Sequence, residues 1–128
     1  TSTVTPTVTP TVTPTSTVTP TPTPSAAAAA GTQKAIFGYG GAAIGNVSIT
    51  NLVSNTGVVA TDTAGVGTAR WALAAAGYGT DKAIFGYGYT GARVSMTNLV
   101  SNTGVVATDT TGVGTARNGV AAAGYSTA

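Results

Sequence analysis

Residues 50–63 read TNLVSNTGVVATDT, and the same letters recur unchanged at residues 97–110. An identical stretch at a fixed offset, here 47 residues, is the signature of a repeat architecture, in which one structural unit is copied along the chain. In the second copy, the polar segment at 101–104 separates two runs of β-favouring residues, which is typical of a hairpin with an Asn/Gly turn. The stretch therefore predicts two strands and a joining turn in each copy.

The repeat extends on both sides of this stretch. Three shorter sequences also occur twice: KAIFGYG at 34–40 and 82–88, GVGTAR at 65–70 and 112–117, and AAAGY at 74–78 and 121–125. The first of them recurs after 48 residues rather than 47, because the loop at 89–93 is one residue shorter than its counterpart at 41–46. A period of this length has room for four short strands, which is the size of one propeller blade.

Each period predicts four short strands. In the second copy they are expected at 73–78, 82–87, 94–100 and 105–110, followed by a Gly/Thr-rich loop at 111–116. No window of the chain shows an apolar period of 3.6 residues, so we expect almost no helix. The predicted fold class is all-β, with two four-stranded repeats behind an extended Thr/Pro N-terminal arm.

Composition divides the chain near residue 25. All six prolines lie before that point, and all charged residues lie after it. The five alanines at 26–30 stand where the first strand of the first repeat is expected. We therefore expect a low-complexity Thr/Pro arm at 1–25, a first β repeat at 26–73, a second β repeat at 74–120, and the first strand of an incomplete third repeat at 121–128.

An arginine precedes the Ala-rich run in both copies, as Thr68-Ala-Arg70 before 74–76 and as Thr115-Ala-Arg117 before 121–123, and the strand at 82–88 ends in Gly-Tyr-Gly. In this order the elements of residues 26–128 resemble kelch-type β-propeller repeats, of the kind found in phage tail and bacterial surface structural proteins. Two departures from that family are the Tyr between the paired glycines and the Val-Val at 105–106, where its fourth strand carries Trp. The resemblance implies a propeller-type fold with a structural or binding role.

The number of repeats leaves the assembly open. A closed propeller has roughly four to eight blades, and this chain has two, which alone would expose an unpaired sheet edge. Three arrangements fit: a piece of a longer repeat protein, several copies that close a ring, or copies that join head to tail. In the last of these, the joining element would be either residues 120–127, which would add a strand to a neighbour's sheet, or the Thr/Pro arm.

Threonine occupies every odd position of the N-terminal arm from 1 to 23, and the even positions there hold Ser, Val or Pro. Dense Thr beside Pro is the composition of O-glycosylated stalks, although it also suits a flexible spacer. The tract fits polyproline II, and equally a β-extended chain that lines its threonines along one face. We expect O-glycosylation at Thr1, Thr3, Thr5, Thr7, Thr9, Thr11, Thr13, Thr15, Thr17, Thr19, Thr21 and Thr23.

Composition also excludes several function classes. Charged residues make up 6% of the chain, against roughly 25% in ordinary soluble domains. The absence of Cys and His removes thiolate nucleophiles, imidazole bases and the usual zinc ligands. A net charge of +2 with no basic run does not indicate nucleic-acid binding, and no apolar run is long enough for a membrane span. We expect no catalytic, cofactor or metal site.

Few polar residues are candidates for a specific role. Asn46 begins an Asn-Val-Ser glycosylation pattern, which is a weak signal because its copy is lost in the second repeat. The pairs Asp62 with Asp109 and Arg70 with Arg117 occupy equivalent positions in the two repeats. We expect from them one turn-stabilising polar contact per repeat rather than a carboxylate pair or a cation site.

The aromatic residues are expected to fill the space between the repeats. Six of them belong to this set: Phe37, Tyr39, Tyr78, Phe85, Tyr87 and Tyr125. Trp71 and Tyr89 have no aromatic counterpart in the other copy, so they are the candidates for exposed contacts.

These features predict a structural subunit of an extracellular fibre, pilus-like appendage or phage tail structure, located outside a cell, on its surface or on a virion. The expected partners are copies of the chain itself, with covalent glycans on the arm. The alternative is a fragment of a carbohydrate- or receptor-binding β-propeller. An enzyme would require Asp62, Asp81 and Asp109 to converge in one cleft.

Overall fold

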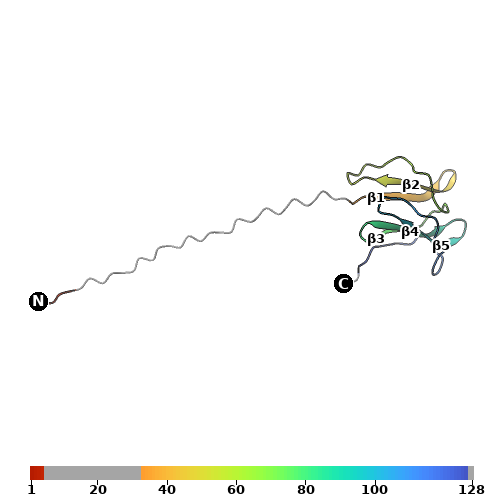
Figure 1. Ribbon diagram of the computed structural model, residues 1–128. Helices are drawn as coiled ribbons and strands as arrows, with labels where there is room; N and C mark the ends of the chain where they lie inside the picture. Colours follow the sequence, from red (N-terminus) through yellow and green to blue (C-terminus); the bar gives the residue numbers. More distant parts are fainter. Residues whose placement is uncertain (5–32, 127–128) are drawn as a thin grey trace.

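The computed structural model describes residues 1–4 and 33–126, and every regular element in this part of the chain is a β-strand (Figure 1). Strands β1 (Ala35–Ala42) and β2 (Gly45–Val53) form a two-stranded antiparallel sheet. Strands β3 (Ala74–Tyr78), β4 (Lys82–Tyr89) and β5 (Arg93–Val100) form a three-stranded antiparallel sheet in that order. The all-β prediction is confirmed, and no described segment is a helix with the length and hydrophobicity that crossing a membrane requires.

The Gly-Tyr-Gly sequence places the same irregularity in both repeats. The register of β1 against β2 shifts between Gly38 and Gly40, and that of β4 against β5 shifts between Gly86 and Gly88. The tyrosines between them have φ angles of 62° and 64°, and the glycines that follow have 119° and 116°. A bulge of this kind bends the strand and redirects the side chain at that point, so Tyr39 leaves the alternation of β1. Tyr39 is buried, whereas Tyr87 at the same position of β4 is half-buried.

The predicted fourth strand of each repeat is not a regular strand. Residues 58–63 and 105–110 return along β2 and β5, but they form isolated bridges such as Val53 with Val59 and Val100 with Val106. An amide side chain interrupts each ladder, because Asn51 and Asn98 donate to the carbonyls of residues 60 and 107 at 3.1 Å. The expectation of two four-stranded kelch-like repeats is therefore not confirmed.

The predicted start of a third repeat is also not a strand. Residues 121–126 have no regular structure, although Gly124 lies beside Gly77 of β3. The segment 121–125 has the same sequence as β3, which forms by pairing with β4, the strand that follows it. In the described part of the chain no strand follows 121–125, so this segment lacks the corresponding partner. The predicted first strand at 26–30 lies outside the described residues.

The hydrophobic core lies between the two repeats rather than inside either one. Its buried apolar residues are Tyr39 from the first repeat and Phe85, Val100 and Val106 from the second, with Ile36, Val66, Leu73 and Ala83 packed against them. The prediction that aromatic residues fill this space is confirmed for Tyr39 and Phe85. It is wrong for Phe37, Tyr78 and Tyr125, which are exposed.

Candidate functional site

Arg70 is completely buried at the junction of the two repeats. Its Nε donates to the Tyr87 carbonyl at 2.8 Å and its Nη2 to Asn98 Oδ1 at 2.6 Å, so two groups of the second repeat hold it. Its guanidinium carbon lies 4.5 Å from the ring centroid of Tyr39 in the first repeat. A buried charge is costly unless it is fully partnered, and Arg70 meets that condition only because both repeats supply partners.

Asp109 completes the junction from the second repeat. Its carboxylate accepts hydrogen bonds from Thr68, at 3.0 Å from the backbone N–H and 2.5 Å from the hydroxyl, and from Asn98 Nδ2 at 2.9 Å. Arg70 Nη1 lies 3.8 Å away. Burial by itself would raise the pKa of Asp109, but the hydrogen bonds from Thr68 and Asn98, together with the Arg70 charge, outweigh burial and lower that pKa.

Phe85 is the apolar anchor of the junction. It is 3% exposed and packs edge-to-face on Tyr39, with 5.2 Å between the ring centroids. Gly38 is required there, because a Cβ at that position would lie 2.8 Å from Cζ of Phe85 and 3.0 Å from Cγ2 of Thr50. We call Gly38, Tyr39, Thr50 and Arg70 the closed socket: Tyr39 packs on Phe85, Gly38 leaves room for that ring beside Thr50, and the Arg70 guanidinium lies over Tyr39.

Tyr39 is fixed inside the closed socket by its hydroxyl. The hydroxyl donates to the Val66 carbonyl at 2.9 Å, which ties β1 to the segment that leads to Arg70. Burial raises the pKa of Tyr39, and the nearby Arg70 charge opposes that rise without cancelling it. The phenol is therefore neutral and acts as a hydrogen-bond donor at ordinary pH.

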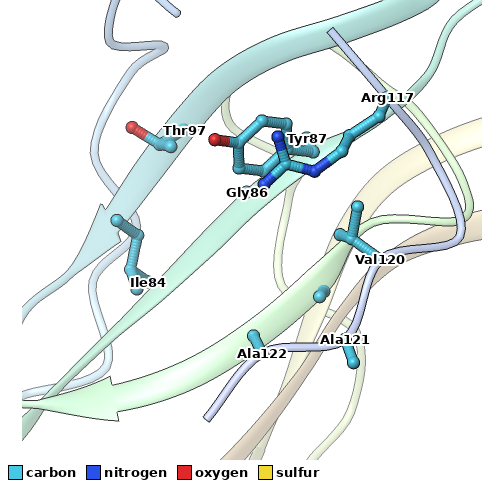
Figure 2. Close-up of a pocket in the computed structure, with 9 residues that line it drawn as sticks. Ile84, Gly86, Tyr87, Thr97, Arg117, Val120, Ala121 and Ala122 are labelled. Atoms are coloured by element: carbon cyan, nitrogen blue, oxygen red, sulfur yellow. The ribbon is translucent and has the colours of Figure 1, made fainter. Parts of the chain in front are cut away.

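The second repeat carries the same four residue types in the same arrangement, but no side chain of the described residues fills the space between them. Gly86, Tyr87, Thr97 and Arg117, here called the open socket, line a hollow of about 130 Å³ together with Val120–Ala122 (Figure 2). Arg117 stacks on Tyr87 with 4.1 Å from its guanidinium carbon to the ring centroid. The Gly88 N–H donates to the Arg117 carbonyl at 3.0 Å, as that of Gly40 donates to Arg70 at 2.9 Å.

The structure also locates the residues that the sequence singled out. Trp71 and Tyr89 pack on each other with ring centroids 5.8 Å apart, and Trp71 is 46% exposed. Asn46 lies at the start of β2 and donates to the Tyr89 carbonyl at 3.3 Å. Thr1 and Thr3 are exposed, and the other ten arm threonines, Thr5 to Thr23, lie outside the described residues.

The three aspartates have separate partners. Asp62 accepts from Asn51 and Asp109 from Asn98, so the expected polar contact within each repeat is present, while Asp81 accepts from Asn102 at 3.2 Å. Among residues 1–4 and 33–126, no group of three side chains suited to holding a metal ion comes together. What the sequence did not reveal is that Arg70 and Asp109 also join the two repeats.

Comparisons with protein-family models, curated proteins and solved structures found no match to this chain. The resemblance to kelch repeats therefore rests on the sequence pattern alone.

Proposed function

We propose that the protein is a structural subunit that assembles head to tail with copies of itself through β-strand contacts, in an extracellular fibre, pilus-like appendage or phage tail structure. One observation carries the proposal. Strand β4 has β3 along one edge and β5 along the other, whereas β1, its copy, has a strand partner only in β2 within the described part of the chain. The copy of β3, at 121–125, is in turn without a strand partner there.

The pairing inside the second repeat shows how two copies would join. Ala75 of β3 stands opposite Phe85 of β4 in an antiparallel register. By equivalence, Ala122 of one copy would stand opposite Phe37 of the next copy, and 121–125 would add a strand along the edge of β1 that has no strand partner among the described residues. Strand addition of this kind supplies affinity through main-chain hydrogen bonds. The contact joins unlike surfaces, so it closes as a ring or continues as a filament.

The Thr/Pro arm suits the outside of such an assembly. Its twelve alternating threonines and six prolines have the composition of an O-glycosylated stalk. Glycans on the arm would surround the assembled subunits and supply the hydration that a chain with 6% charged residues otherwise lacks. This part of the proposal rests on composition.

Sedimentation velocity of the full chain over a wide concentration range, with negative-stain electron microscopy of the same samples, tests the proposal. We expect a series of sizes that grows with concentration, together with rings or filaments in the images. A single monomeric species at every concentration would overturn it.

A further inference from the structure

Identical residues of the two repeats differ sharply in burial: on one face the residues of the second repeat are buried and their copies in the first repeat are exposed. Phe85 is 3% exposed and its copy Phe37 is 62% exposed. Val106 is 8% exposed and its copy Val59 is 53% exposed. Local sequence cannot cause this difference, because both copies have the same neighbours along the chain. It arises because the first repeat covers this face of the second repeat, while no described residue covers the same face of the first.

The opposite face shows the reverse difference. Thr50, Tyr39 and Arg70 are buried in the closed socket, whereas Thr97 and Tyr87 are half-buried and Arg117 is exposed in the open socket. The hollow there is bounded by Tyr87 with the Arg117 guanidinium over it, by Ile84 and Thr97, and by Val120 and Ala122 (Figure 2). The side chain that occupies the corresponding space in the closed socket is Phe85.

We infer that Phe37 of one copy inserts into the open socket of a second copy, in the way that Phe85 fills the closed socket within the chain. The inference rests on the proposed function and names the contact that joins the copies. The occupant is a second copy because each copy presents Phe37, on β1, and the open socket, beside β4, as the two halves of one interface. The same interface already exists within each chain as the junction between the two repeats.

The polar groups around the contact are already arranged. Asn51 Nδ2 donates to Asp62 Oδ1 at 2.7 Å in the first repeat, as Asn98 donates to Asp109 at 2.9 Å in the second. In the joined copies, Arg117 donates to Asn51 Oδ1 and the Tyr39 carbonyl of the next copy. These groups stand where Asn98 Oδ1 and the Tyr87 carbonyl stand for Arg70. The Asn51–Asp62 pair therefore needs no rearrangement on binding, which favours affinity.

Three single substitutions test this contact by sedimentation velocity. Phe37→Ala removes the inserted side chain and Gly86→Ala obstructs the open socket. Ile44→Ala is the control, because it removes another exposed apolar side chain, at the turn between β1 and β2. The variants are expected to fold, since Phe37 is largely exposed and a Cβ at Gly86 would make an ordinary contact of 3.4 Å with Thr97. A variant that has lost the native circular-dichroism spectrum is not folded. If Gly86→Ala is that variant, Arg117→Ala replaces it as the socket variant.

We expect Phe37→Ala and Gly86→Ala each to weaken self-association by at least about thirtyfold, the effect of losing a central aromatic anchor, and Ile44→Ala to associate as the wild type does. A mixture of the two defective variants should form one-to-one dimers that do not grow. The Gly86→Ala chain retains Phe37, and the Phe37→Ala chain retains an open socket.

The outcomes separate this inference from the proposed function. If the wild type assembles and both variants assemble equally well, or if the mixture forms no heterodimer, the Phe37 contact is wrong and self-assembly stands. If the wild type is monomeric at every concentration, both are wrong.

Discussion

Replacing Arg70 by alanine should lower the free energy of unfolding, because it weakens the contact between the two repeats. Replacing its copy Arg117 should leave that free energy nearly unchanged. Arg70 is fully buried and donates at 2.6–3.1 Å to Asn98, Tyr87 and Thr68. The Arg70→Ala variant leaves the buried Asn98 Oδ1 and the Tyr87 carbonyl without these donors, and it removes the cation that faces Asp109. Arg117 ends the same GVGTAR sequence, but its side chain is exposed, and among the described residues that side chain makes a single hydrogen bond, at 3.4 Å to the Thr115 carbonyl.

The size of the effect follows from burial. Removing one partner from a buried charged network lowers the free energy of unfolding by about 3–5 kcal/mol. A substitution at an exposed position usually changes it by less than about 0.5 kcal/mol. Small domains have only about 5–15 kcal/mol in total. The Arg70→Ala loss therefore corresponds to a fall in Tm of roughly 12 °C or more for a domain of about 100 residues.

Urea and thermal unfolding, followed by the fluorescence of the single tryptophan, provide the assay. Trp71 follows Arg70 directly and packs on Tyr89 of β4, so its emission reports contact between the linking segment and the second sheet. Both variants are measured at a dilution at which the chain is monomeric, so that self-association does not contribute. Equal losses for Arg70→Ala and Arg117→Ala, both under about 1 kcal/mol, would refute the reasoning.

Three further predictions concern the glycines, one carboxylate and the arm. Gly38→Ala should lower the free energy of unfolding by about 1–3 kcal/mol through overpacking, because its Cβ would lie 2.8 Å from Phe85. Urea unfolding should show a far smaller loss for Gly86→Ala. Similar losses for the two variants would contradict the closed socket. The lowered pKa of Asp109 should stabilise the fold above about pH 4, the range of an unfolded aspartate. That stability is lost as the pH falls through the folded pKa, so thermal melts at stepped pH should show a shallower acid loss in Asp109→Asn, and an unchanged acid loss would count against the role given to this carboxylate. Protein purified from its natural source should exceed its polypeptide mass by whole sugar units on the peptide that holds residues 1–25, and mass spectrometry that finds only the bare peptide would exclude O-glycosylation there.

The strands of the second repeat were predictable to within two residues at each end. Alternating residues in 94–100 and the apolar run at 82–87 match β5 and β4, and the turn at 101–104 is found where its Asn and Gly predicted it. The Ala-rich segment at 74–78 forms a strand despite its helix propensity, because pairing with β4 outweighs a weak local preference. Local pattern was therefore sufficient for these three strands.

The fourth strands and the junction could not be predicted in the same way. The side-chain amides of Asn51 and Asn98 take carbonyls that a ladder would otherwise use, and this depends on tertiary geometry. Arg70 and Arg117 end the same GVGTAR sequence, so that motif does not distinguish the buried arginine from the exposed one. The available signal was that Arg, Asn and Asp are copied together in a chain with only eight charged residues.

The chain contains only two phenylalanines, and this makes the central claim directly measurable. Fluorophenylalanine incorporated at Phe37 and Phe85 should give two ¹⁹F resonances in dilute solution, of which only that of Phe37 responds to exchange of H₂O for D₂O. As the concentration rises and copies join, we expect the Phe37 resonance to broaden, move toward that of Phe85 and lose its solvent response. Assemblies that form while Phe37 keeps its solvent-exposed resonance would contradict the account.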